Sequence, residues 1–200
     1  MKVYIILSDT GTLFTRMIKM FTKEQLNHAS ISFTDNLDTT YSFGRKRPHN
    51  PFIGGFVQED LKGKLFQNAT CAIYSFTVSE EEYSNMIGFI KEIEETREKY
   101  KYNLIGLFGI LLKTKIQNKN AFFCSQFVAT VLMRGGFSIN DKPACFARPS
   151  DIINYETMKL EYAGPIQAYL SGEEKEVPTS KKSYINRKLQ LAYNSLLSLL

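Results

Sequence analysis

A cysteine at the start of a predicted helix is the side chain in this sequence best placed for nucleophilic chemistry. The apolar spacing after Cys124 predicts a helix over residues 124–134 that ends at Gly135 and Gly136. Unpaired backbone N–H groups and the positive end of the helix dipole favour a thiolate over a thiol at such a position. A thiolate there is a nucleophile, and the N–H of Cys124 can stabilise an oxyanion.

A histidine that opens a predicted strand is the best candidate for the matching base. Apolar and polar residues alternate over residues 29–33, which is typical of a half-buried strand, and His28 stands directly before them. The second histidine, His49, lies in a predicted loop between two prolines, where we expect a surface residue. Because His28 and Cys124 are far apart in the sequence, only the fold can bring them together.

Structural packing is the alternative interpretation for each cysteine. Aromatic residues surround Cys124, and free cysteine is often buried as a small apolar side chain. We favour catalysis for Cys124 because a helix start both lowers a thiol pKa and supplies hydrogen-bond donors. Cys71 and Cys145 lack the Cys-x-x-Cys or histidine spacing of a metal site, so we expect them to pack in the core. No phosphate-binding glycine motif is present, and we expect neither a metal ion nor a cofactor.

The third catalytic residue, which would orient the imidazole, has two candidates. Residues 39–43 have a strand pattern and are expected to pair with the histidine strand in a hairpin. A turn centred on Asn36-Leu37 puts Tyr41 on the face of His28, whereas a slip by one residue presents Ser42 instead. Neither this strand nor the glycine after it contains an acidic residue, so a Cys–His dyad without a third member also stays open.

The remaining elements follow from hydrophobic periodicity and turn residues. Further strands are expected at residues 3–7, 72–78 and 159–163. Further helices are expected at residues 13–21, 80–100, 149–153 and 184–200. Ser79 and Glu82 have the spacing of a capping box at the start of the helix at 80–100. Residues 44–55, which contain two prolines, are expected to form a loop.

Size, charge and cysteine content bound the class of protein. The 200 residues suffice for one domain with a buried core and a short appendage. Lys and Arg residues are scattered and the net charge of +5 is mild, which argues against a nucleic-acid-binding protein. Three cysteines are an odd and sparse set that suits a reducing compartment. The first apolar run is too short for a secretory signal, and no segment is long enough to span a membrane, so we expect a cytoplasmic protein.

We expect three parts along the chain. Residues 1–172 form one domain, residues 173–182 are a charged linker, and residues 183–200 form an amphipathic helix. The segment from Tyr184 to Leu200 carries apolar residues at helical spacing beside two basic residues. It could lie on a membrane surface, pack onto its own domain or pair with a second copy, and the sequence does not fix the oligomeric state.

The order of these motifs resembles the permuted papain-like superfamily of cysteine amidases and peptidases. Its members include the YiiX/YaeF-like, NlpC-type amidases and the lecithin:retinol acyltransferase-like proteins. The matching motifs are His28-Ala29-Ser30-Ile31 for the histidine strand and Phe123-Cys124-Ser125-Gln126-Phe127-Val128 for the cysteine helix. The resemblance spans residues 3–153, and the histidine precedes the cysteine, which reverses the order in papain. Tyr102 resembles a tyrosine that lines the pocket of these enzymes.

The resemblance implies an α+β domain in which an antiparallel sheet packs against helices, with the C-terminal helix as an appendage. It implies Cys124 as the nucleophile, His28 as the general base and a third polar group that orients the imidazole. It further implies that Tyr102 lines the substrate pocket, and packing at the end of its segment is the alternative for this residue. Gln126, which follows the nucleophile on the helix, is a second candidate for a substrate contact, and a solvent-facing or capping role is its alternative. The family commonly carries an acidic or amide side chain at the third position, so this chain departs from the pattern there.

The residue chemistry and the resemblance together predict a cysteine hydrolase. It would cleave an amide bond, in a peptide or an isopeptide, through an acyl-thioester intermediate. Two alternatives stay open. One is a lipid-directed thiol acyltransferase or esterase of the same fold, and the other is a catalytically silent binding module, which a missing acidic partner for His28 would explain. The sequence does not distinguish a peptide-like substrate from a lipid amide.

Overall fold

The computed structural model describes residues 1–11, 25–47, 50–97, 101–102, 121–139, 143–154 and 157–172. At residues 45–47, 50–53, 101–102 and 121 it describes the backbone. Four predictions lie outside the described residues: the helix at 13–21, the linker at 173–182, the C-terminal helix at 184–200 and the loop position of His49.

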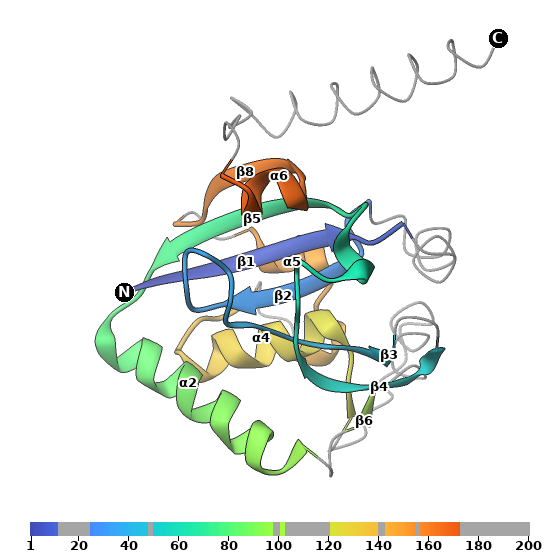
Figure 1. Cartoon of the computed structure of the whole chain (residues 1–200). Coiled ribbons are helices and arrows are strands. Elements are labelled where there is room, and N and C mark those ends of the chain that lie inside the picture. Colours follow the sequence, from blue (N-terminus) through green and yellow to red (C-terminus); the bar gives the residue numbers. More distant parts are fainter. Residues whose placement is uncertain are drawn as a thin grey trace, which may run out of the picture.

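Six antiparallel strands form one sheet in the order β4-β3-β2-β1-β5-β8 (Figure 1). In chain order these strands are β1 (Lys2–Asp9), β2 (His28–Ser32), β3 (Thr40–Arg47), β4 (Asn50–Gln58), β5 (Thr70–Thr77) and β8 (Lys159–Pro165). A separate parallel pair joins β6 (Lys101–Tyr102) to β7 (Ala121–Phe122). The predicted strands at 3–7, 29–33, 39–43, 72–78 and 159–163 all lie within or overlap these elements.

Helices pack against this antiparallel sheet, so the structure is α+β, as predicted. The helices are α2 (Glu80–Glu95), α4 (Cys124–Arg134), α5 (Pro149–Ile152) and α6 (Ile166–Leu170), with two 3₁₀ turns, η1 (Lys64–Phe66) and η3 (Ala144–Phe146). Figure 1 shows α2 and α4 together on one side of the sheet and α6 on the other. Helix α4 has the predicted bounds, which means that its first residue is the cysteine.

Alternating residues of β1 supply two separate hydrophobic cores. Val3, Ile5 and Leu7 face the larger core, which α2 and α4 complete. Tyr4 and Ile6 face a smaller core on the other side of the sheet, together with residues of η1 and α6. Both faces of this central strand are therefore buried, and this accounts for its nearly continuous apolar sequence.

The hairpin of β2 and β3 has the second of the two registers considered from the sequence. Its pairs are Ile31↔Tyr41 and Ser32↔Thr40. This register puts Ser42 on the face of the sheet that carries His28, and Tyr41 on the opposite face. The first register, which would have placed Tyr41 beside His28, is wrong.

The predicted loop at residues 44–55 is wrong. Strand β3 runs on to Arg47 and β4 begins at Asn50, and Gly44 pairs with Gly55 across the two strands. The glycines and prolines of this segment predicted a loop, but such residues are also tolerated in edge strands and where two backbones approach closely. Strand β4 is an edge strand of the sheet.

The start of α2 confirms the predicted capping box. The Ser79 hydroxyl accepts a hydrogen bond from the N–H of Glu82 at 3.2 Å, and the Glu82 carboxylate accepts one from the N–H of Ser79 at 2.7 Å. The helix ends at Glu95 rather than near residue 100, and α6 was not predicted. Helix α6 has 5 residues, which is too short to give a periodic signal.

Replacing Ser79 by alanine is expected to lower the free energy of unfolding by about 1 kcal/mol, because the N–H of Glu82 at the helix start loses its acceptor. Denaturant unfolding followed by circular dichroism measures this change. The matched control is Ser84→Ala, at an exposed position within the same helix, which should change the free energy by less than about 0.5 kcal/mol. Equal effects from the two substitutions would contradict the capping role.

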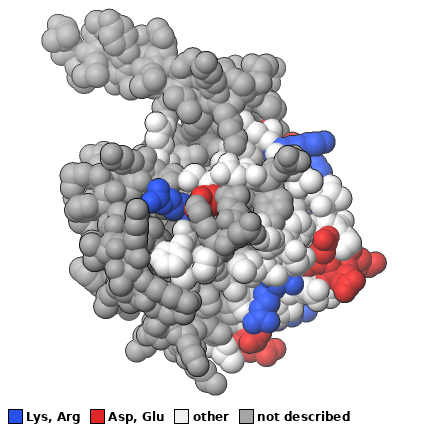
Figure 2. All heavy atoms as spheres, turned by 180° about the vertical axis from the view of Figure 1, so that it is seen from behind, with Lys and Arg blue, Asp and Glu red and all other residues white. Residues whose placement is uncertain are grey.

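The charge distribution on the surface and the length of the helices bear on possible partners. Figure 2 shows acidic and basic side chains lying near one another on the face seen from behind. Within the described parts of the chain, none of the helices is both long and apolar enough to cross a membrane. The predictions about nucleic acid and about a membrane surface stay predictions.

Candidate active site

The start of α4 places a sulfur atom beside the start of β2. Phe123, the extended residue before the helix, provides no side-chain cap, so the N–H groups of the first turn are left for other acceptors. The Cys124 sulfur accepts hydrogen bonds from the N–H groups of Ser125, in that turn, and Ala29, in β2. It also lies 3.9 Å from the carbonyl oxygen of Asn27, which precedes β2. The helix start and the strand therefore surround the sulfur with backbone polar groups.

Packing and a hydrogen bond hold the first turn of α4 in this place. The Phe127 ring lies against Phe43 of β3 and Phe56 of β4, with centroid distances of 5.2 and 5.8 Å. The Ser125 hydroxyl donates to the carbonyl oxygen of Ala147, next to η3, at 2.7 Å. All of these side chains are buried, so the core fixes the position of the helix start.

His28 links the sulfur to a carboxylate. Its Nε2 lies 2.6 Å from Oε1 of Glu59, and its imidazole is also hydrogen-bonded to Cys124. Because Nε2 faces Glu59, Nδ1 is the ring nitrogen left for the sulfur. The side chains of His28 and Glu59 are 16% and 5% exposed, and Cys124 is 6% exposed. The imidazole is therefore the part of this group that borders solvent most.

Glu59 directly follows β4 and reaches back over β3 to β2. Its N–H donates to the carbonyl oxygen of Thr40 at 2.8 Å, which extends the pairing of β4 with β3 by one residue. Its Oε1 accepts hydrogen bonds from His28 and from the hydroxyl of Ser42, the latter at 2.7 Å. Its Oε2 accepts one from the hydroxyl of Ser30 at 2.6 Å. Three donors thus satisfy a carboxylate that is almost fully buried.

Electrostatics favour a thiolate and an imidazolium over the neutral pair. Burial alone would lower the pKa of His28, but the charge of Glu59 and hydrogen bonds to Cys124 and Glu59 outweigh it and raise the pKa to about 10. Burial would also raise the pKa of Cys124. The hydrogen bond and charge of His28, with the N–H donors of Ala29 and Ser125, instead bring that pKa below its ordinary value of 9.0.

The pKa values of Glu59 and of the buried thiol Cys71 also depend on whether hydrogen-bonding or charged partners offset the effect of burial. Burial would raise the pKa of Glu59, but His28 and the two serine hydroxyls lower it. Burial dominates at Cys71 and raises the pKa of its thiol to about 12. Cys71 and Cys145 are both buried and in no disulfide, as expected for packing residues.

Glu59, rather than Ser42 or Tyr41, is the residue whose hydrogen bond to the imidazole the structure describes. Ser42 lies on the correct face but donates to Glu59, and Glu59 contacts the ring. Tyr41 lies on the other face, where its ring stacks on Phe56 with centroids 5.7 Å apart. Glu59 was missed because β4 was taken for a loop. The adjacent aromatic and β-branched residues Phe56 and Val57 were the signal that could have revealed that strand and the acid at its end.

The structure does not place Tyr102 or Gln126, the two predicted substrate-binding residues, at the Cys124 sulfur. The backbone of Tyr102 pairs with Phe122, two residues before the nucleophile, so a role in the pocket stays a prediction. Gln126 is two residues beyond Cys124, which rotates its side chain by about 200° around the helix. It is 9% exposed, and its Oε1 has no hydrogen-bond partner. This direction gives no support to a substrate contact at the sulfur.

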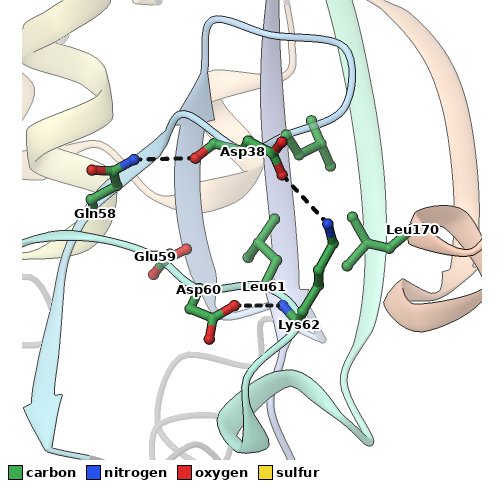
Figure 3. Close-up of a pocket in the computed structure, with 8 residues that line it drawn as sticks. Asp38, Gln58, Glu59, Asp60, Leu61, Lys62 and Leu170 are labelled. Atoms are coloured by element: carbon green, nitrogen blue, oxygen red, sulfur yellow. Dashed lines mark hydrogen bonds and ion pairs between the residues drawn. The ribbon is translucent and has the colours of Figure 1, made fainter.

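Behind Glu59 the molecule has a cavity of about 390 Å³ (Figure 3). Its walls include Leu37, Asp38, Gln58, Glu59, Asp60, Leu61, Lys62 and Leu170. Most of its polar groups already pair with one another: Lys62 Nζ lies 3.7 Å from Asp38, the Lys62 N–H donates to Asp60, and Gln58 donates to the Asp38 carbonyl. Cys124 is not among the lining residues, so this cavity is not the space in front of the sulfur.

In the parts of the chain that the structure describes, no group of three or more His, Cys, Asp or Glu side chains is arranged to hold a metal ion. Comparisons of the chain with family models, with curated proteins and with solved structures gave no match. The geometry of Cys124, His28 and Glu59 is therefore the main indication of function.

Proposed function

We propose that the protein is a cysteine hydrolase that cleaves an amide bond, in a peptide or an isopeptide. The observation that carries the proposal is the chain of contacts from Cys124 through His28 to Glu59, with 2.6 Å between the imidazole and the carboxylate. A nucleophile that is hydrogen-bonded to a base, which a third group orients, is the common arrangement of covalent hydrolases. The arrangement of sheet and cysteine helix also supports a relation to the permuted papain-like fold.

The first half of the reaction would form an acyl-enzyme. The Cys124 thiolate attacks the carbonyl carbon, a carbon–sulfur bond forms and the carbonyl oxygen becomes an oxyanion. The backbone N–H of Cys124 would supply part of the oxyanion hole. The His28 imidazolium then gives its proton to the nitrogen of the leaving group, the carbon–nitrogen bond breaks and a thioester remains.

The second half would release the acid. Neutral His28 takes a proton from water, the resulting hydroxide attacks the thioester and the carbon–sulfur bond breaks. Cys124 leaves as a thiolate and His28 keeps the proton, which restores the starting ion pair. Glu59 stabilises the imidazolium in both halves and holds the ring in one orientation, without taking the proton itself.

The two alternatives have less support. A binding module without turnover was attractive because no acidic residue was expected beside His28, and Glu59 now removes that reason. A lipid-directed acyltransferase or esterase would use the same three residues, and the segment from Tyr184 to Leu200 that could contact lipid lies outside the described residues. An amine leaving group gains most from an imidazolium beside the nucleophile, so we propose an amide substrate.

Alkylation of the three cysteines tests the proposed nucleophile. At neutral pH, iodoacetamide is expected to modify Cys124 at least about 10-fold faster than Cys71 or Cys145, because only the thiolate reacts and His28 lowers the pKa of the Cys124 thiol. The labelling rate of Cys124 should also reach its plateau below pH 9.0. Peptide mass spectrometry after short exposures measures both quantities. If Cys124 reacts no faster than Cys71, the proposed nucleophile is wrong.

The reaction itself is tested with a pooled library of short peptides and lysine isopeptides. Mass spectrometry of the products identifies the bond that is cut, and the fastest-cleaved member becomes the assay substrate. Vesicles that carry acyl donor lipids provide the comparison. Acyl transfer from the vesicles without cleavage in the library would replace the amide hydrolase by the acyltransferase.

A further inference from the structure

Backbone pairing between β2 and β3 is confined to the end of the hairpin near its turn. In the described strands the pairs are Ile31↔Tyr41 and Ser32↔Thr40. Continued by one step, the same register brings Ser30 opposite Ser42, but no backbone pair is formed there. A side chain joins the strands at this point instead: the Glu59 carboxylate accepts from Ser30 on one oxygen and from Ser42 on the other.

We propose that Ser30 and Ser42 are positioning residues that hold the Glu59 carboxylate against His28. The proposal rests on the proposed function, since it assigns these serines a role in the same site. They do not touch the sulfur in this assignment and act through Glu59. Without them, the carboxylate would keep one of its three hydrogen bonds, the one from the imidazole.

A glutamate needs such restraint more than a shorter acid would. Its side chain has three rotatable bonds, so fixing it in one rotamer costs conformational entropy. Glu59 also lies in the wall of the cavity shown in Figure 3, which offers the carboxylate a second position outside the site. A carboxylate gains hydration free energy when it moves toward water. Two hydroxyl donors on its oxygens oppose this movement.

The two serines are well suited to this task. Both are fully buried, at 0% exposure, and both stand on strands of the sheet. Their side chains have one carbon each, so the hydroxyl positions follow the backbone closely. Their distances to the carboxylate, 2.6 and 2.7 Å, are those of hydrogen bonds to a charged acceptor. The backbone of β2 and β3 therefore fixes the two hydroxyl groups, and these restrict the position of the carboxylate.

Gly44 shows how closely these groups are packed. A Cβ atom at this position would lie 3.2 Å from the Ser42 hydroxyl, 3.5 Å from Cε1 of His28 and 3.7 Å from Oε1 of Glu59. Glycine therefore leaves the space in which the imidazole, the carboxylate and the hydroxyl meet. A side chain at residue 44 would therefore crowd the hydrogen bond between Ser42 and Glu59.

The test compares Ser30→Ala, Ser42→Ala and the double variant with Ser32→Ala. Ser32 is the matched control: it is a fully buried serine on β2, two residues from Ser30, and its hydroxyl donates to the carbonyl oxygens of Thr34 and Thr39. The readout is the alkylation rate of Cys124 between pH 5 and 10, which needs no substrate. Thermal unfolding of every variant is measured in parallel.

We expect each single substitution near Glu59 to lower the Cys124 alkylation rate at pH 6 by about 3- to 10-fold, and the double variant to lower it further. The midpoint of the pH profile should move toward the ordinary thiol pKa of 9.0. Ser32→Ala should leave this midpoint unchanged, whatever its effect on thermal stability. A midpoint that stays at the wild-type value in the double variant, or moves equally in Ser32→Ala, overturns the proposal.

A second comparison shows whether the serines act through the carboxylate. In a Glu59→Gln background, replacing Ser30 or Ser42 should cause no additional change in the pH midpoint, because contacts with one group are not additive. Full additivity would overturn the positioning role. If the wild-type Cys124 thiol titrates at its ordinary pKa, the proposed function itself is contradicted. If the wild-type pKa is lowered and stays equally low in the serine variants, only the positioning role of Ser30 and Ser42 is contradicted.

Discussion

Replacing Cys124 by alanine is expected to lower kcat/KM for the library substrate by a factor on the order of 10⁴ to 10⁶, because no other group can form the acyl-enzyme. Rapid alkylation should disappear with it. Cys145→Ala is the matched control, since this thiol is 8% exposed, comparable to Cys124 at 6%, and lies outside the site. Substrate turnover that survives in Cys124→Ala, at a rate comparable with Cys145→Ala, would exclude covalent catalysis by this thiol.

Replacing Glu59 by glutamine is expected to lower kcat by a factor on the order of 10² to 10⁴, with a smaller effect on KM. Glutamine has nearly the same shape but no charge, so the imidazolium loses the attraction that raises the pKa of His28. The steady-state rates of wild type and variant measure the loss. Gln58→Glu is a useful control, because it adds a carboxylate one residue away at an exposed position that has no described contact with His28. A full rate in Glu59→Gln would mean that the enzyme works as a Cys–His dyad.

The same substitution should change how stability depends on pH. The raised pKa of His28 contributes stability that is fully present below pH 6.5 and is lost as pH rises toward about 10. The lowered pKa of Glu59 contributes stability that is present above pH 4.5 and is lost as pH falls through its folded value. The pair therefore stabilises the fold most between about pH 4.5 and 6.5. In Glu59→Gln this maximum should flatten.

The parts of the fold with a strong local pattern could be predicted from the sequence. The buried strand β1 is a continuous apolar run, and α2 carries a capping box at Ser79. Helix α4 begins at Cys124 and ends at Arg134, where a glycine pair follows its apolar face. Each of these signals comes from residues adjacent in the chain, so no knowledge of tertiary contacts was needed.

The parts that depend on pairing between distant segments could not be predicted in the same way. Strand β4 contains glycines and a proline, and only its pairing with β3 makes it a strand. In the sequence, Glu59 stands next to Asp60 and close to Lys62, so it cannot be distinguished from an ordinary charged residue of a surface turn. Its function arises when β4 is placed beside β3, which carries the carboxylate to His28. The register of β2 and β3 was similarly open until the structure fixed it.

The order of the site residues along the chain has a consequence for synthesis. His28 opens β2 and Glu59 directly follows β4, whereas Cys124 begins α4 much later. A ribosome therefore releases the proposed base and its carboxylate before it makes the proposed nucleophile. The nascent thiol has the acidity of any unstructured cysteine until α4 docks on the finished strands. If Cys124 is the nucleophile, we expect its reactivity toward electrophiles and oxidants to begin only when α4 docks, so an unfinished chain should lack this reactivity.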